Sequence, residues 1–454
     1  MKVYDVIVIG AGDAGLGIAF KAVSEGLKVA LVDKGTVGGT CINSGCVPSK
    51  TLITAADRFM ESEENTKLGI RSKKTEVDYS AVMKRMRSAV TDGRNAILNA
   101  IKESTNLDFM HKACYFVDEH TLEVGDQNIR GKKIFIATGA RPSIPPIPGL
   151  ETIRYLTNES ILRLERKPES MIFIGGGYIA LEYAHFFSAL GVKVTIIERN
   201  ATLLHSGEPE ISELLKKTLG RRVELHLGAE TIAVRHGFKG HAVMAKEVKS
   251  GRKKEIAAQS VVVSAGRTSN ADLLRPEQAG VETGAANFIK VDDYLRTNNK
   301  HIWAIGDAID RAMFTHAGDK EAELAWHNAT HRKKIRMDFA QVPHAVYTHP
   351  QIASVGLTER QARKRHKILV GRALYSDTVM GTAMMEREGF AKAVVEKGTG
   401  RILGFHIIGP HAAMLIQEVV NAMLNKSDVK SITGSMHIFP ALSNIIPETF
   451  NNLR

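Results

Sequence analysis

One segment of this chain occurs twice, and this repetition limits the fold more than any other feature of the sequence. Residues 6–9 and 172–174 are apolar runs typical of buried strands, and each leads directly into a glycine-rich turn. Six positions then match at a constant offset of 165 residues: Gly10, Gly12, Gly26, Lys28, Val29 and Asp33 correspond to Gly175, Gly177, Gly191, Lys193, Val194 and Glu198. Agreement at so many positions without a gap indicates two copies of one supersecondary unit.

Each copy has the pattern of a dinucleotide-binding βαβ unit. The glycines of residues 10–15 permit a tight turn, close approach of the backbone to a pyrophosphate, and close packing of the next helix on its strand. In the second copy, Ala180 replaces the third glycine, a variation that the contact between helix and strand tolerates. Asp33 and Glu198 end the second strand of each copy, where a carboxylate accepts the hydroxyls of an adenosine ribose. We therefore expect two bound dinucleotides.

The acid of the second copy indicates which nicotinamide cofactor binds there. Glu198 favours the free 2′-hydroxyl of NADH, because a carboxylate repels a 2′-phosphate. Arg199 follows immediately and weakens that preference, so NADPH is the alternative.

Two of the three cysteines, Cys41 and Cys46, lie five residues apart in the segment from Gly38 to Lys50. A structural zinc site needs four ligands, and no second cluster of cysteine and histidine completes one here, so we predict no metal. A static disulfide that closes so short a loop adds little rigidity to a protein of this size. A redox-active dithiol is the remaining interpretation, provided that a nearby group delivers electrons.

The composition excludes some classes of protein. With 454 residues and 44% hydrophobic content, the chain is long enough for several domains with substantial cores. The first apolar run is too short for a signal sequence or a membrane span, which predicts a soluble, cytoplasmic protein without a membrane partner. The net charge of +12 is dispersed over short clusters such as residues 251–254 and 331–334, a distribution that favours solvated surfaces over a nucleic-acid interface.

The order of the patterns predicts an α/β protein with two Rossmann-like dinucleotide-binding domains and a C-terminal α+β dimerisation domain. The first domain covers residues 1–149 and is completed by residues 268–337. The second dinucleotide-binding domain covers residues 150–267, and the last domain covers residues 338–454. The proline-rich stretch from Pro142 to Pro148 marks the first border.

The whole pattern resembles the flavoprotein disulfide reductases of the pyridine nucleotide class, the family that includes dihydrolipoamide dehydrogenase, glutathione reductase and mercuric reductase. The most specific motif is the segment 38–50, supported by Ile305-Gly306-Asp307 and by residues 342–359. The resemblance covers nearly the full length. It implies a homodimer in which electrons pass from NAD(P)H through FAD to a disulfide of Cys41 and Cys46, and then to a disulfide or another small acceptor.

The resemblance also implies roles for individual residues. Cys46 corresponds to the sulfur that faces the flavin, Cys41 to the sulfur that exchanges with substrate, and Lys50 and Glu182 to an ion pair beside the flavin. Cys114 matches no family position and is expected to be a small core residue. The residues expected at FAD are Gly10, Gly12, Gly15, Asp33, Lys34, Gly39, Thr40, Thr138, Gly139, Gly306 and Asp307. Those expected at NAD(P)H are Gly175, Gly177, Tyr178 as an aromatic gate, Glu198, Arg199 and Gly266.

The C-terminal segment departs from the family. Many members carry a catalytic histidine directly before a proline and a supporting glutamate five residues after that histidine, whereas Phe439 and Asn444 occupy these positions here. Neither side chain exchanges a proton. His437 lies two residues earlier and is the candidate substitute, although such a shift moves a side chain several ångströms along an extended segment. The chain also ends without the cysteine pair of mercuric reductase, which leaves the acceptor open among a disulfide, a metal ion and a quinone; a non-catalytic flavoprotein subunit is the alternative from another class.

Overall fold

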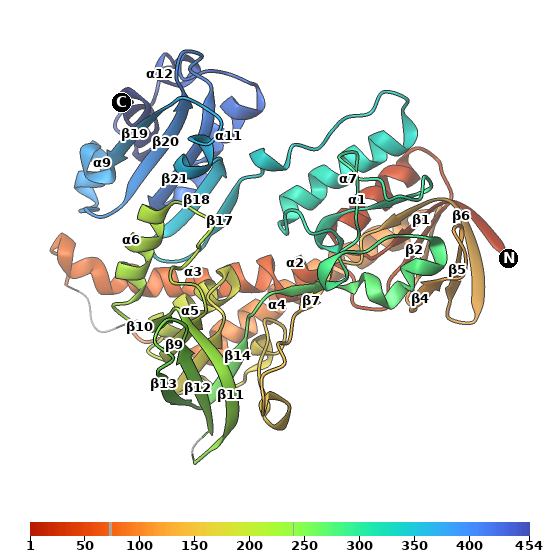
Figure 1. Ribbon diagram of the computed structural model, residues 1–454, viewed down its shortest axis with the longest axis horizontal. Coiled ribbons are helices and arrows are strands. Elements are labelled where there is room, and N and C mark those ends of the chain that lie inside the picture. The colour runs from red at the N-terminus through yellow and green to blue at the C-terminus, as the bar shows by residue number, and fades with distance from the viewer. Residues whose placement is uncertain (72–74, 239) are drawn as a thin grey trace. The chain divides into compact units, whose positions relative to one another are not determined.

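The computed structural model describes residues 1–71, 75–238 and 240–454, which form two compact units (Figure 1). The first unit contains residues 1–51, 83–143 and 266–339, and the second contains residues 52–82, 144–265 and 340–454. Residues 52–82 thus group with the second unit, and the predicted domain borders stay predictions. The division of that second unit into a cofactor-binding and an interface domain remains a prediction.

A seven-stranded sheet organises the first unit. Its parallel part has the order β3-β2-β1-β6, and β16 also pairs with β6. These strands are β1 (Lys2–Ile9), β2 (Val29–Val32), β3 (Leu107–Met110), β6 (Gln127–Ile136) and β16 (Ile302–Ala304). An antiparallel edge consists of β4 (Cys114–Phe116) and β5 (Thr121–Val124), and a separate two-stranded sheet pairs β7 (Ala140–Pro142) with β15 (Arg267–Ser269). β2 and β16 are apolar and buried along their whole length, as expected where helices cover a parallel sheet on both faces.

Helices α1 (Asp13–Ser24) and α7 (Thr315–Thr330) pack against each other in this unit (Figure 1). Gly17 of α1 faces Ala322 of α7, because a Cβ at Gly17 would lie 3.6 Å from Cβ of Ala322, an ordinary van der Waals distance. The other helices are α2 (Gly39–Ser44), α3 (Cys46–Glu64) and α4 (Tyr79–Glu103), of which α3 and α4 continue into the second unit. Cys41 and Cys46 therefore lie on two successive helices, with Cys46 as the first residue of α3.

The second unit contains three sheets. A parallel sheet of order β10-β9-β8-β14 repeats the arrangement of the first unit, with β8 (Ser170–Ile174), β9 (Lys193–Glu198), β10 (Val223–Leu227) and β14 (Ser260–Val263). Helices α5 (Tyr178–Ala189) and α6 (Pro209–Leu219) belong to it. A three-stranded antiparallel sheet consists of β11 (Ala229–Gly237), β12 (Gly240–Glu247) and β13 (Lys253–Ala258).

The third sheet of this unit is antiparallel and has the order β17-β18-β21-β20-β19. Its strands are β17 (His344–Val346), β18 (Gln351–Gly356), β19 (Ile368–Leu374), β20 (Phe390–Glu396) and β21 (Ile402–Gly409). Short helices surround it: α8 (Glu359–Ala362), α9 (Val379–Ala383), α10 (Ala412–Leu415), α11 (Gln417–Leu424), α12 (Lys430–Thr433) and α13 (Ile445–Asn451). Phe405 and Phe450 are central to its separate apolar core. Among the helices of the described residues, none is long and apolar enough to cross a membrane.

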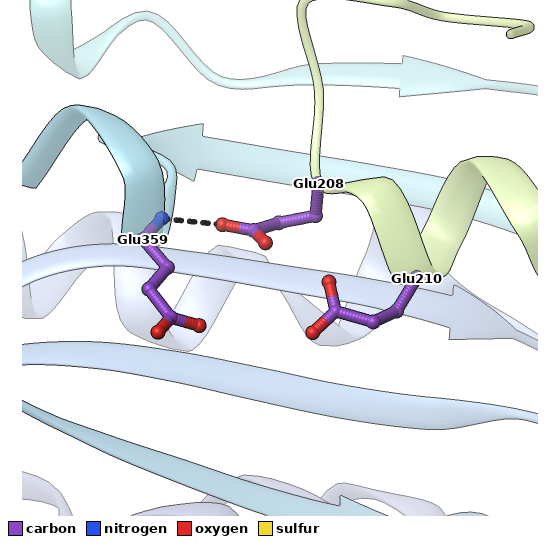
Figure 2. Close-up of side chains that lie close together, drawn as sticks. All are labelled: Glu208, Glu210 and Glu359. Atoms are coloured by element: carbon purple, nitrogen blue, oxygen red, sulfur yellow. Dashed lines mark hydrogen bonds between the residues drawn. The ribbon is translucent and has the colours of Figure 1, made fainter.

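Three carboxylates in the second unit surround one ammonium group. Oxygens of Glu208, Glu210 and Glu359 lie close together and point toward a common centre (Figure 2). Such a group could hold a metal ion, but Nζ of Lys392 lies 2.8 Å from an oxygen of each carboxylate. Burial alone would lower the pKa of Lys392, and the hydrogen bonds to Glu208, Glu210 and Glu359 outweigh it and raise that pKa. The lysine therefore stays charged and replaces a metal ion, joining α6 to β20 and α8.

We predict that Lys392→Met lowers the free energy of unfolding by about 3 kcal/mol, because it leaves the fully buried carboxylate of Glu208 without its counter-charge. Urea denaturation of both proteins measures this difference. Lys397→Met, which removes an exposed lysine one residue beyond the same strand, is the matched control. Adding Glu208→Gln to Lys392→Met should recover part of the loss. Equal stability of Lys392→Met and the control would contradict this account of the cluster.

Candidate active site

The glycine-rich turn of the first unit has the backbone geometry that a dinucleotide requires. Gly10 has φ +111°, and a Cβ there would lie 2.2 Å from the carbonyl oxygen of Ala137, so only glycine fits. The turn leads into α1, whose N-cap Gly12 provides no side-chain hydrogen bond, which leaves the first amides of the helix available to a phosphate. Asp33 closes the turn, because its Oδ2 accepts a hydrogen bond of 2.6 Å from the amide of Ala11.

Three buried polar atoms of the first unit have no hydrogen-bond partner among the described residues: Oγ1 of Thr138, Nε of Arg267 and Oε1 of Glu321. Two of these side chains contact the predicted Gly306 and Asp307, because Oε2 of Glu321 accepts the amide of Gly306 at 2.6 Å and Nε of Arg267 lies 3.6 Å from Oδ2 of Asp307. Burial raises the pKa of Glu321 to about 8, so this carboxyl holds a proton at neutral pH. Buried polar atoms without partners indicate that a polar group binds here.

The two cysteines of the motif lie close enough to share a hydrogen bond, and both are thiols in this structure. That hydrogen bond with Cys46, and then burial, raise the pKa of Cys41 above its ordinary value. Sγ of Cys46 also lies 3.4 Å from Oγ1 of Thr315, the first residue of α7. Cys46 is thus at the N-terminus of α3 and beside the N-terminus of α7, two positions that stabilise negative charge on its sulfur. The raised pKa of Cys41 favours its protonated form.

The third cysteine has a different environment. Cys114 lies in β4 and is buried in the apolar core of the first unit, as predicted. Burial raises its pKa to about 12, which keeps the thiol protonated and unreactive.

The second glycine-rich turn repeats the first in detail. Gly175 has φ +98°, and a Cβ there would lie 2.5 Å from the carbonyl oxygen of Ser264. Oε2 of Glu198 accepts the amide of Gly176 at 2.6 Å, as Asp33 accepts Ala11. Oε1 of Glu198 accepts two further hydrogen bonds of 2.7 Å, from the amide and from Nδ2 of Asn200. Three donors therefore hold the Glu198 carboxyl group at the position expected for the ribose.

The remaining residues predicted at the cofactors lie as follows. Tyr178 begins α5 directly after Gly177, its N-cap, and Arg199 is exposed beside Glu198. Lys34 is exposed after Asp33. The other predicted residues lie in turns or helix starts of the first unit: Gly15 in α1, Gly39 and Thr40 in α2, Gly139 with φ +64° after β6, and Gly266 with φ +116° before β15.

Lys50 and Glu182, the predicted ion pair, belong to different units. Nζ of Lys50 lies 3.4 Å from Oγ of Ser49 on α3, and Oε1 of Glu182 accepts the amide of Tyr347 at 3.2 Å. Their pairing with each other stays a prediction.

The C-terminal segment has a cis peptide bond between Phe439 and Pro440, and the Phe439 ring is 74% exposed. His437 faces α11, where its Nε2 lies 2.9 Å from Oε1 of Glu418. Asn444 supports the turn, because its Oδ1 accepts the amide of Ala441 and its Nδ2 donates to the carbonyl of Ile438.

Comparison with known proteins assigns the chain to a family. Residues 4–330 match the family described as pyridine nucleotide-disulphide oxidoreductase, and residues 342–450 match the dimerisation domain of the same family. The chain belongs to the pyridine nucleotide-disulphide oxidoreductases. It is therefore an enzyme that uses FAD and NAD(P)H for disulfide oxidoreduction, with two dinucleotide-binding domains and a dimerisation domain.

Three relatives illustrate the range of the family. A mercuric reductase from Lysinibacillus sphaericus is 34% identical over 95% of this chain and 79% of its own length. Dihydrolipoyl dehydrogenase 2 from Arabidopsis thaliana is 32% identical over 98% of this chain and 82% of its own. The Cu(II) complex of the HOCl-induced flavoprotein disulfide reductase RclA from Escherichia coli is 27% identical with a TM-score of 0.89, covering 99% of both chains.

The residues of the first unit fit the cofactor of this family. The turn at Gly10 offers the N-terminus of α1 to the pyrophosphate, and Thr138, Arg267 and Glu321 offer polar atoms that have no other partner. Bound FAD supplies the two-electron transfer that couples NAD(P)H to the thiol pair. The protein holds the two thiols within hydrogen-bond distance of each other, favours the protonated form of Cys41, and places Cys46 at the N-terminus of α3 and beside Thr315.

Several residues of the site were not predicted from the sequence. Thr315 and Glu321 lie outside the motifs, so only the fold brings them to the site, whereas Arg267 directly follows the predicted Gly266. Asn200 could have been noticed from its place two residues after Glu198, since asparagine readily caps a turn.

We predict that the geometry around Glu198 makes NADH the preferred cofactor. Asn200→Ala removes one of three hydrogen bonds and should lower the ratio of kcat/KM for NADH over NADPH about fivefold, the size of one such bond. Glu198→Gln should lower it further, because the repulsion of the 2′-phosphate disappears. Steady-state kinetics with both cofactors measures the ratio. Arg199→Ala, which removes a cation instead, should raise it, and a wild-type enzyme that prefers NADPH would refute the prediction.

Proposed function

We propose that the thiols of Cys41 and Cys46 pass their electrons to a thiophilic metal ion such as Hg(II) or Cu(II). The observation that carries this proposal is the aromatic ring of Phe439 before the cis proline, at the position where the family resemblance expects a proton donor. The names of two similar proteins are consistent with this proposal, since one protein is a mercuric reductase and one solved structure is a Cu(II) complex.

The chemistry explains why a missing acid favours a metal ion. When a thiolate attacks a disulfide, the departing sulfur needs a proton to leave as a stable thiol. A bound metal ion needs none: two thiolates form a sulfur–sulfur bond while one Hg(II) becomes Hg(0), or two Cu(II) become two Cu(I). Cys41, which the family resemblance assigns to exchange with substrate, is only half-buried within the chain.

His437 supports a second candidate, a disulfide acceptor. Its hydrogen bond with Glu418 is the type of pair that holds a histidine in one orientation for proton transfer. The similarity to a dihydrolipoyl dehydrogenase is consistent with this reading. Under this alternative, His437 and not residue 439 protonates the departing thiol.

We further propose that the enzyme acts as a homodimer in the cytoplasm. The matched dimerisation domain carries large exposed apolar side chains, among them Met436 and Ile438 in the segment before Pro440. Burial of such side chains against a second copy stabilises a dimer. A cytoplasmic location suits a reaction that depends on reduced thiols.

The acceptor can be assigned by anaerobic oxidation of NADH with Hg(II), Cu(II) or lipoamide as the only acceptor. We expect kcat/KM for at least one of the metal ions to exceed that for lipoamide by about a hundredfold, the size of a missing general acid. Cys41→Ser should abolish the metal-dependent rate, and Cys114→Ser, which changes the buried thiol, should retain it. Faster turnover of lipoamide that falls about a hundredfold in His437→Gln would overturn the proposal in favour of the second candidate.

A further inference from the structure

The turn before the redox pair packs directly on the glycine-rich loop of the first unit. The amide of Gly38 donates to the carbonyl of Ala11 at 2.7 Å. Gly39 has φ +53°, and a Cβ there would lie 2.7 Å from Cα of Gly12. The position of α2, which begins at Gly39 and carries Cys41, therefore depends on the conformation of this turn.

One side chain joins α2 to the turn. Asn43 lies between the two cysteines, and its Nδ2 is within hydrogen-bond distance of three carbonyl oxygens: Thr36 at 3.2 Å, Val37 at 3.0 Å and Gly39 at 2.8 Å. The Asn43 side chain thus contacts the backbone at both ends of the segment 36–39, which precedes Cys41. A rotation of the Asn43 amide by half a turn would bring its oxygen against these carbonyls and lose all three contacts.

Arg94 of α4 determines the orientation of that amide. Its Nε donates a short hydrogen bond to Oδ1 of Asn43. Because a guanidinium group only donates, it must face the amide oxygen, and this leaves Nδ2 toward the carbonyls. Helix α4 packs closely against this segment. A Cβ at Gly93 would lie 3.2 Å from Cγ2 of Ile42, and a Cβ at Gly38 would similarly lie very close to the side chain of Ile97.

We infer that Arg94 is a positioning residue for the redox pair, acting through Asn43 to hold Cys41 beside Cys46. A fixed α2 keeps the two sulfurs in reach and raises the effective concentration of one thiol at the other. Without Arg94, the segment that carries Cys41 is less fixed. Formation of the disulfide between Cys41 and Cys46 is then less favourable. This inference rests on the redox role proposed above for the two cysteines.

Equilibration of the FAD-loaded enzyme in anaerobic glutathione buffers tests the inference. Oxidised glutathione gains two electrons and two protons as the dithiol becomes a disulfide, and alkylation followed by mass spectrometry counts the remaining thiols. Arg94→Met should lower the equilibrium constant for disulfide formation about tenfold, which corresponds to about 30 mV. Arg94→Lys, which keeps a donor, should recover part of the effect. Lys84→Met, on an exposed position of the same helix, should match the wild type.

A double-mutant cycle tests whether the arginine acts through the asparagine. Asn43→Ala alone should shift the equilibrium at least as far as Arg94→Met, and the double variant should shift it no further than Asn43→Ala. Additive effects, or an equilibrium unchanged in Arg94→Met, would overturn the inference. If Cys41 and Cys46 form no disulfide in any variant, including the wild type, the redox role itself fails, and this outcome is distinguishable from failure of Arg94 alone.

Discussion

A hydrogen bond between an acidic side chain and a glycine-rich turn occurs in both dinucleotide-binding units, and the arrangement of the site depends on it. Asp33 accepts the amide of Ala11, and Glu198 accepts the amide of Gly176, each at 2.6 Å. Both bonds tie the end of the second strand to the turn that begins the first helix. The acid is thereby held in one orientation before any ribose binds, and the turn keeps the shape in which helix amides face a phosphate. In the first unit the same turn also packs against the start of α2. The conformation of this turn therefore affects both the cofactor site and the thiol pair.

Much of this arrangement was predictable because it is local in sequence. The gapless repeat fixed the order of strand, turn, helix and acid in both copies, and β1, α1 and β2 recur as β8, α5 and β9. The burial of Cys114 followed from its lack of any motif.

The rest depends on contacts between distant segments, which periodicity does not reveal. Thr315 contacts Cys46 although the two residues are 269 positions apart in the sequence, and Arg94 contacts Asn43 across 51 positions. No pattern near Lys392 indicates that it lies among three glutamates from two other elements. The hydrogen bond between His437 and Glu418 on α11 shows the same limit, because no sequence pattern links these two residues, which lie 19 positions apart. Such positions follow from packing, and packing is decided by the whole fold.

The central claim is that the Cys41 and Cys46 pair exchanges electrons with bound FAD, with the negative charge on Cys46. Stepwise anaerobic reduction of the FAD-loaded enzyme, followed by absorbance, tests it most directly. After two electrons, we predict a long-wavelength charge-transfer band between a thiolate and the flavin, which Cys46→Ser abolishes. A two-electron stage without this band, in which the flavin is bleached while both cysteines remain oxidised, would contradict the account.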